Sequence, residues 1–77
     1  MKDLLEYIAR GLVEDKDSVT VTVDEPDEEG LTVYHLSVGE RDMGRVIGKQ
    51  GRIAKAIRTV MRAAAARENA KVSVEID

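Results

Sequence analysis

The sequence predicts an α+β domain of residues 1–77 in which helices pack on one face of a three-stranded sheet. Two segments, residues 2–13 and 52–67, repeat apolar side chains at three- and four-residue steps, which is typical of amphipathic helices. Three further segments alternate apolar with polar residues and are rich in β-branched side chains, which predicts half-buried strands. These strand segments are residues 19–23, 31–38 and 71–76. The chain is long enough for one modest core, since a domain of about 60 residues already buries about 60% of its unfolded surface.

The first half of the chain is expected to form a helix and two antiparallel strands. Helical spacing marks the apolar side of the first helix by Leu4, Leu5, Ile8, Leu12 and Val13. Residues 15–18 predict a polar turn before the first strand. Residues 24–30 contain the only proline, five acids and a glycine, so they predict an exposed turn between the strands. In the second strand one face carries Tyr34, Leu36 and Val38.

The second half predicts two helices joined by a short loop, and then a last strand. Asp42 suits the N-cap of a short helix. This helix would end at Gly48, as a C-terminal glycine in the left-handed region. A longer helix follows over residues 52–67, and its buried side is predicted to consist of Ile53, Ile57, Val60, Met61 and Ala64. Residues 71–76 complete the order α-β-β-α-α-β.

Charge is distributed unevenly along the chain. The formal net charge is −3, yet residues 41–62 hold seven basic residues against one acid, whereas residues 1–40 hold three basic residues against eleven acids. Salt screens charges that are more than about 8–10 Å apart under physiological conditions, so the local excess matters more than the sum. We therefore expect local, weak to moderate and strongly salt-dependent binding to nucleic acid.

The basic region contains a Gly-x-x-Gly sequence, Gly48-Lys49-Gln50-Gly51, between two amphipathic segments. Glycine lacks a Cβ and tolerates positive φ, so the backbone can pass close to a bulky anionic ligand. Lys49 lies inside this loop, and Arg45 and Arg52 flank it. A plain turn between helices remains the alternative, because glycine often ends helices. A basic stripe along the following helix, equally consistent with a solvated face, consists of Arg52, Lys55, Arg58 and Arg62.

Other kinds of site find little support. The chain has no cysteine and a single histidine, His35, so no cysteine- or histidine-based metal site is predicted. The acids of residues 24–30 lack the ligand and glycine spacing of a calcium loop. Residues 44–50 fail the P-loop pattern, because three residues rather than four separate the glycines and Gln50 follows the lysine. We assign no catalytic residue, no metal and no cofactor, and we expect no enzymatic activity.

The compartment is predicted from what the sequence lacks. No apolar run approaches the roughly 18 residues of a membrane-spanning helix, and the N-terminus lacks the uncharged core of a signal peptide. The absence of cysteine fits a reducing compartment. We therefore expect a cytoplasmic protein without membrane contact.

A family resemblance rests on the segment Val46-Ile47-Gly48-Lys49-Gln50-Gly51 in this order of elements. It resembles the Val-Ile-Gly-x-x-Gly hallmark of KH domains, and the order resembles the type II KH fold of bacteria. The whole chain is similar in size to the small stand-alone KH proteins of the KhpA family. The resemblance implies binding of single-stranded RNA without catalysis, as an RNA chaperone or post-transcriptional regulator. It also implies a homodimer, or action beside a larger KH protein of the KhpB (Jag) family.

The resemblance further implies roles for individual residues. The loop that would hold the backbone of about four nucleotides consists of Gly48, Lys49, Gln50 and Gly51, with Arg45, Arg52 and Lys55 nearby. The apolar floor under the bases would consist of Met43, Val46, Ile47, Ile53 and Ile57. The strand beside the groove would read base edges, and the sequence does not identify which of its residues do so.

Two other functions remain open from the sequence. In one, the groove or the alanine-rich helix surface of residues 60–66 docks a partner protein, and RNA contact is incidental. The same alanines suit a symmetric dimer, because small side chains let a second helix approach closely. In the other, the groove binds single-stranded DNA, which the sequence does not distinguish from RNA.

Overall fold

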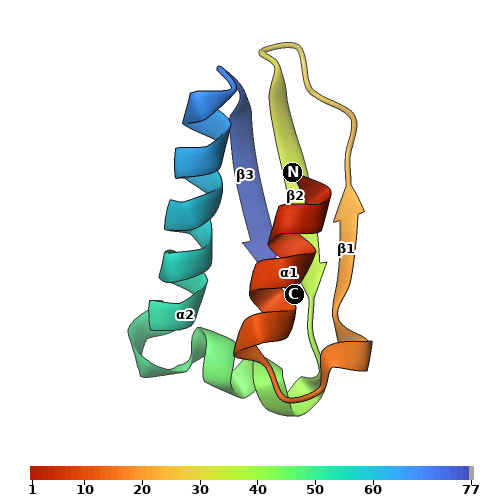
Figure 1. Ribbon diagram of the computed structural model, residues 1–77, viewed down its shortest axis with the longest axis vertical. Helices are drawn as coiled ribbons and strands as arrows, with labels where there is room; N and C mark the ends of the chain where they lie inside the picture. The colour runs from red at the N-terminus through yellow and green to blue at the C-terminus, as the bar shows by residue number, and fades with distance from the viewer. Residues whose placement is uncertain (77) are drawn as a thin grey trace.

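The computed structural model describes residues 1–76, which form a three-stranded sheet with both helices on one of its faces (Figure 1). The elements are α1 (Lys2–Leu12), the short 3₁₀ helix η1 (Lys16–Ser18), β1 (Thr20–Val23), β2 (Leu31–Ser37), α2 (Glu40–Arg67) and β3 (Lys71–Ile76). Each predicted strand is present, with ends within one residue of the expected ones. The two helices expected after β2 are both present, separated by the non-helical residues 48–51 and labelled together as α2, and the α+β class is confirmed.

The sheet has the order β1-β2-β3, so β2 lies in the centre. β1 pairs with β2 antiparallel, with Val21 opposite Leu36. β3 pairs with β2 parallel, with Val74 beside Tyr34. Parallel neighbours need a long crossover, and α2 provides it by running back over the sheet (Figure 1). This connection places the middle of α2 beside β3, which is an edge strand.

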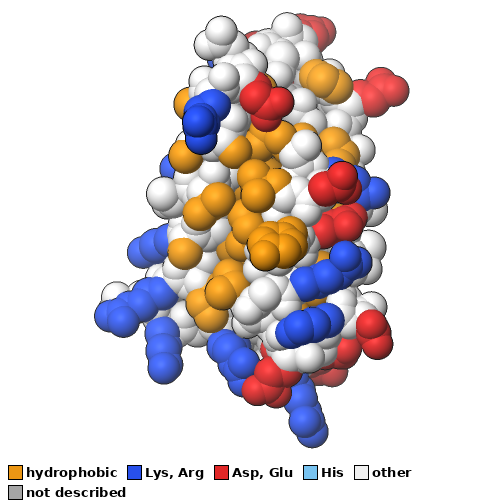
Figure 2. Space-filling model, viewed as in Figure 1, with side chains coloured by type: hydrophobic (Ala, Val, Ile, Leu, Met, Phe, Trp, Pro, Cys, Tyr) orange, Lys and Arg blue, Asp and Glu red, His pale blue; other side chains and the backbone are white. Residues whose placement is uncertain are grey.

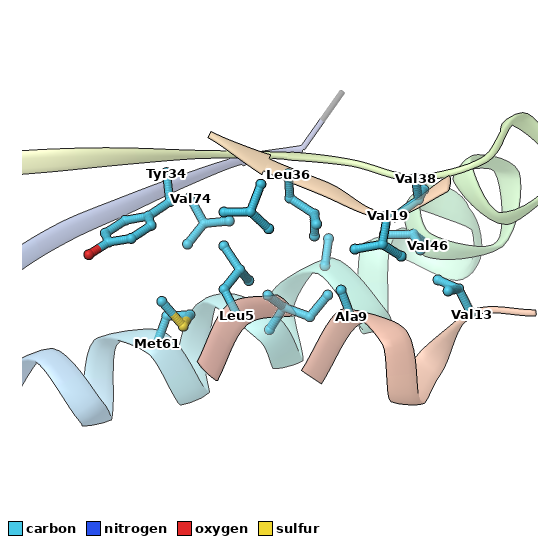
Figure 3. Packing of buried hydrophobic residues seen from close by; sticks show 13 residues of the cluster. Leu5, Ala9, Val13, Val19, Tyr34, Leu36, Val38, Val46, Met61 and Val74 are labelled. Carbon is cyan, nitrogen blue, oxygen red and sulfur yellow. The ribbon is translucent and has the colours of Figure 1, made fainter. Parts of the chain in front are cut away.

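The core lies between the sheet and the two helices (Figure 3). The sheet residues buried here include Tyr34 and Leu36 on β2 and Val74 on β3, and Val38 just after β2 is buried too. The largest fully buried side chains of the core are Leu5, Leu36, Val46, Ile57 and Met61. Complete burial of one such side chain contributes about 1.5–3 kcal/mol. The core therefore fixes α2 on both sides of its interruption, through Val46 before it and Ile57 after it.

The buried sides of both helices differ from the predicted ones. In the second part of α2 the buried residues are Ala54, Ile57, Met61 and Ala65, while Val60 is 44% exposed and Ala64 is half-buried. In α1 the buried residues are Leu5 and Ala9, followed by Val13 just after the helix, while Leu12 is 40% exposed. The cause is the same in both helices. Alanines form part of the buried side, Ala9 in α1 and Ala54 and Ala65 in α2, so the centre of that side shifts away from the larger apolar residues on which the prediction rested.

Asp42 is not the N-cap of α2, contrary to the prediction. The helix begins at Glu40 with Gly39 as its N-cap. The carboxylate of Asp42 instead accepts the backbone N–H of Glu14 at 3.1 Å and that of Asp15 at 3.0 Å. The side chain is 3% exposed, and these hydrogen bonds, that of Glu14 first, hold its pKa below the usual 3.8. Asp42 thus joins the end of α1 to the start of α2.

Within residues 1–76, neither helix combines the length and the apolar character needed to cross a membrane.

Candidate nucleic-acid interface

The Gly-x-x-Gly sequence forms a loop of residues 48–51 that interrupts α2. Three consecutive residues have left-handed backbone angles: Lys49 (φ 51°, ψ 49°), Gln50 (φ 64°, ψ 23°) and Gly51 (φ 70°, ψ 29°). Gly48 has φ −65° and ψ 173°, so the expected left-handed glycine at the end of the first segment is not observed. The left-handed turn begins one residue later and is made mostly by side-chain-bearing residues.

This backbone conformation is costly for two of the loop residues. Left-handed angles cost a residue with a Cβ about 1–2 kcal/mol, and Lys49 and Gln50 both adopt them. Gly51 avoids that cost because it has no Cβ. Such conformations persist only when the surrounding structure imposes them, and they are frequent at ligand-binding sites. Here the surrounding structure is the pair of helical segments anchored in the core by Val46 and Ile57.

The loop borders an open hollow of about 490 Å³. Its lining residues are Gly44, Arg45, Gly48, Lys49, Arg52 and Ile53. A Cβ built on Gly44 or on Gly48 would meet no atom within 4 Å, and neither glycine has positive φ. The fold therefore does not require glycine at these two positions, and both leave room for a ligand above the backbone. Three cations around a glycine-lined hollow are suited to a phosphate group.

The structure separates the predicted floor residues into two groups. Val46 and Ile57 are each 1% exposed and belong to the core, so they support the site from beneath. Ile47 is 54% exposed, and Met43 and Ile53 are half-buried. Of the floor residues, only Ile53 also lines the hollow beside the loop.

The guanidinium of Arg45 forms an ion pair with Glu14. Its Nη2 donates a hydrogen bond to Oε1 of Glu14 at 3.0 Å, and the two side chains are 51% and 75% exposed. This contact, together with the negative charge of Glu14, raises the pKa of Arg45 above its usual value. Arg45 therefore stays fully charged, and its guanidinium contacts Glu14, which lies two residues after the end of α1.

A second hollow, of about 230 Å³, lies between α2 and the edge strand β3. Its lining residues are Arg58, Met61, Arg62, Val72, Ser73 and Val74. Arg58 Nε donates to the carbonyl oxygen of Val74 at 3.2 Å, which fixes the arginine against the strand. Sequence reasoning placed Arg58 and Arg62 on a basic stripe but did not identify Val72 or Ser73. The four-residue spacing of the arginines and the alternation of β3 were the available signals.

Charge and apolar surface occupy different sides of α2. At 100° per residue, one side of its second part carries the basic flank, which we define as Arg52, Lys55, Arg58 and Arg62. Another side of the same part of α2 carries the apolar flank, which we define as Ile53, Ala56, Val60 and Ala63. Figure 2 shows a continuous apolar band over the middle of the helical face, with basic side chains projecting below it, near the interruption of α2 in Figure 1.

Among residues 1–76, no group of three or more His, Asp or Glu side chains is arranged to hold a metal ion.

Comparison with known proteins identifies the family. A family model described as the KH domain of KhpA/KhpB matches residues 2–76. The chain belongs to the KhpA/KhpB KH-domain family. This KhpA/KhpB KH domain is 57% identical over 76 residues to the RNA-binding protein KhpA of Clostridium acetobutylicum, with 99% of each chain covered. Identity to the RNA-binding protein KhpA of Listeria monocytogenes is 49% over 76 residues, covering 99% of this chain and 97% of that one.

Solved structures of Era share the fold of this KhpA/KhpB KH domain. A variant of Aquifex aeolicus Era bound to GDP·AlF4⁻ has a TM-score of 0.66 at 20% identity and covers 97% of this chain. Era in complex with MgGDPNP and nucleotides 1506–1542 of 16S ribosomal RNA has a TM-score of 0.62, also at 20% identity. The chain spans 28% of the length of each Era chain.

Proposed function

We propose that this chain is a single KH domain that binds single-stranded RNA at the 48–51 loop. The observation that carries the proposal is the left-handed turn at Lys49, Gln50 and Gly51, which borders a hollow lined by three cations. The names of the relatives support it, since the similar chains from Clostridium and Listeria are RNA-binding proteins. The loop would approach the phosphate backbone of about four nucleotides, as Gly-x-x-Gly loops do in KH domains.

The residues have distinct roles in this proposal. Gly48 and Gly51 let the loop backbone approach the phosphates, and Lys49, Gln50, Arg45 and Arg52 contact the phosphates or lie beside them. Ile47 and Ile53 contact the bases, and Val46 supports them from the core. Lys55 extends the positive charge along the basic flank. The bases then run toward the hollow between α2 and β3, where Ser73 and backbone groups of the edge strand offer hydrogen bonds.

The cellular role that fits such a site is positioning or shielding of RNA, as an RNA chaperone or post-transcriptional regulator in the cytoplasm, without catalysis. A Gly-x-x-Gly site contributes phosphate contacts and apolar surface, and the structure offers no aromatic platform there. With modest affinity per nucleotide, the domain would act as a homodimer or beside a larger KhpB (Jag)-like KH protein. The exposed apolar flank of α2, including Val60 at 44% exposure, supports a protein contact of this kind.

The proposal is tested by the double substitution Lys49→Asp/Gln50→Asp. Aspartate tolerates left-handed angles better than most residues, so the loop backbone should be retained while its charge changes by −3. The matched control is Asn69→Asp/Lys71→Asp, which changes the charge equally at the other end of α2. Asn69 is also left-handed, with φ 55°. Fluorescence anisotropy of a labelled degenerate 12-nucleotide RNA, with circular dichroism to verify folding, gives the affinities.

We expect the loop variant to bind RNA at least about tenfold more weakly than the wild type, and the control to change far less. If three phosphates are neutralised, raising the salt from 50 to 200 mM should weaken wild-type binding about 15- to 20-fold. Equal binding by the wild type and the loop variant would refute the assignment of the loop. Wild type that binds no RNA would favour the role of a protein-interaction subunit. A labelled DNA of the same sequence, measured in parallel, tests the preference for RNA.

A further inference from the structure

Glu14 is held at two points by one side of α2. Its backbone N–H donates to Oδ1 of Asp42, and its carboxylate accepts a hydrogen bond from Arg45. Asp42 and Arg45 are three residues apart in the first segment of α2 and therefore face the same way. Asp42 fixes the backbone of Glu14, and this places the carboxylate beside the guanidinium of Arg45.

The contact between Glu14 and Arg45 is not needed to join α1 to α2. The carboxylate of Asp42 already makes that connection with two hydrogen bonds from a buried position. Ser18 Oγ, which donates to Asp15 Oδ2 at 2.6 Å, further orders the same corner. The pair between Glu14 and Arg45 is solvent-exposed, and exposed ion pairs contribute little to stability.

The same contact does affect the hollow beside the loop. Arg45 is one of the three cations that line it. A guanidinium presents the same planar set of donors to a carboxylate and to a phosphate. The carboxylate of Glu14 therefore takes a donor of Arg45 that a phosphate would use, and it adds a negative charge close to the site.

We propose that Glu14 limits the affinity of the loop for RNA by competing with a phosphate for Arg45. This inference rests on the proposed function and extends it to the connection after α1, where Glu14 is the competitor. RNA binding at Arg45 requires the pair with Glu14 to open. The affinity of the site is thus set by an acidic residue that is 31 positions away from Arg45 in sequence.

The experiment compares Glu14→Gln, Arg45→Gln, the double variant and the wild type, with the same labelled 12-nucleotide RNA. Glu25→Gln is the matched control. It removes the same charge from the exposed connection between β1 and β2, at the opposite end of the molecule from the interruption of α2 (Figure 1). Thermal melts verify that all five proteins are folded.

We expect Glu14→Gln to bind RNA about two- to fivefold more tightly than the wild type, from the usual strength of an exposed ion pair. The control should stay close to the wild type. In the Arg45→Gln background, the Glu14→Gln change should have no effect, because the competition needs both residues.

Two outcomes would overturn the inference while leaving the RNA site intact. In one, Glu14→Gln and Glu25→Gln shift the affinity equally, which indicates a general effect of charge. In the other, the gain persists without Arg45. If the wild type binds no RNA at all, the proposed function fails and this inference fails with it.

Discussion

At the scale of single residues, the two glycines of the loop have different reasons to be glycine. Gly51 has φ 70° and would be strained with any side chain. Gly48 has backbone angles that any residue adopts, and open space surrounds the position of its missing Cβ. The fold thus explains Gly51, whereas it does not require glycine at position 48, which fits the proposed close approach of RNA.

This difference predicts opposite effects of alanine at the two positions. Gly51→Ala should lower the free energy of unfolding by about 1–2 kcal/mol, because a Cβ is strained at this φ. Gly48→Ala should leave it unchanged or raise it by up to about 1 kcal/mol, since alanine reduces the entropy of the unfolded chain. Urea denaturation of the wild type and the two variants measures both changes in the free energy of unfolding.

RNA titration of Gly48→Ala tests whether RNA is the ligand that approaches this glycine. Gly48→Ala should weaken RNA binding several-fold although its stability is intact, because the methyl group occupies the space left for the phosphate backbone. Wild-type affinity in this variant would show that the RNA does not approach Gly48 closely.

At the scale of elements, the corner after α1 is joined to the start of α2 by the buried carboxylate of Asp42. Its pKa is lowered in the folded protein. Between the folded and the unfolded pKa the unfolded chain binds more protons, so stability rises with pH there. The contribution of Asp42 is complete above the unfolded value near 3.8 and is lost as the pH falls through the folded pKa.

We therefore predict that Asp42→Asn lowers the Tm by several degrees at pH 7, because an NH2 donor would replace one of the two carboxylate oxygens that each accept a backbone N–H. The difference in unfolding free energy between wild type and variant should shrink as the pH is lowered from about 5 toward 2. Asp17→Asn removes an exposed carboxylate in the same corner and is the control. Urea denaturation over this pH range is the measurement, and a difference that stays constant would contradict the role of the charge.

Much of the arrangement of elements could be predicted from the sequence, because strand alternation and helical periodicity are local patterns. The loop position and the charge around it also followed from residues 44–52. The role of Asp42 could not be predicted, since its partners Glu14 and Asp15 are 28 and 27 positions away. The pairing of Arg45 with Glu14 was missed for the same reason. The exposure of Val60 was missed because alanines, which carry little weight in periodicity, occupy part of the buried side of α2.

At the scale of the whole molecule, α2 separates two kinds of surface. Its basic flank lies toward β3, where Arg58 bonds to Val74, and its apolar flank is left uncovered at Val60. An exposed apolar strip beside small residues is suited to a second helix. In the proposed function, α2 would therefore hold RNA on one side and a protein on the other.

We predict that Val60→Lys prevents self-association, because it introduces a charge into the centre of the apolar flank. Val60 is not part of the buried core, so the Tm of the monomer should not fall. Thr59→Lys adds the same charge to the neighbouring exposed position, 100° around the helix, and should leave association unchanged. Sedimentation equilibrium over a range of protein concentrations distinguishes these outcomes. A wild type that stays monomeric, or equal effects of both lysines, would contradict the dimer surface.

In the proposed dimer, the separation of the two flanks would also determine how many RNA segments one assembly can reach. Two copies joined through their apolar flanks would keep both basic flanks open, at a fixed spacing. Once the first site is occupied, the second binds at a high effective concentration, which is in the millimolar range for short flexible connections. Such a bivalent particle would retain an RNA with two suitable single-stranded segments far longer than an RNA with one. It would also hold two separate strands next to each other, which is the geometry that strand pairing requires.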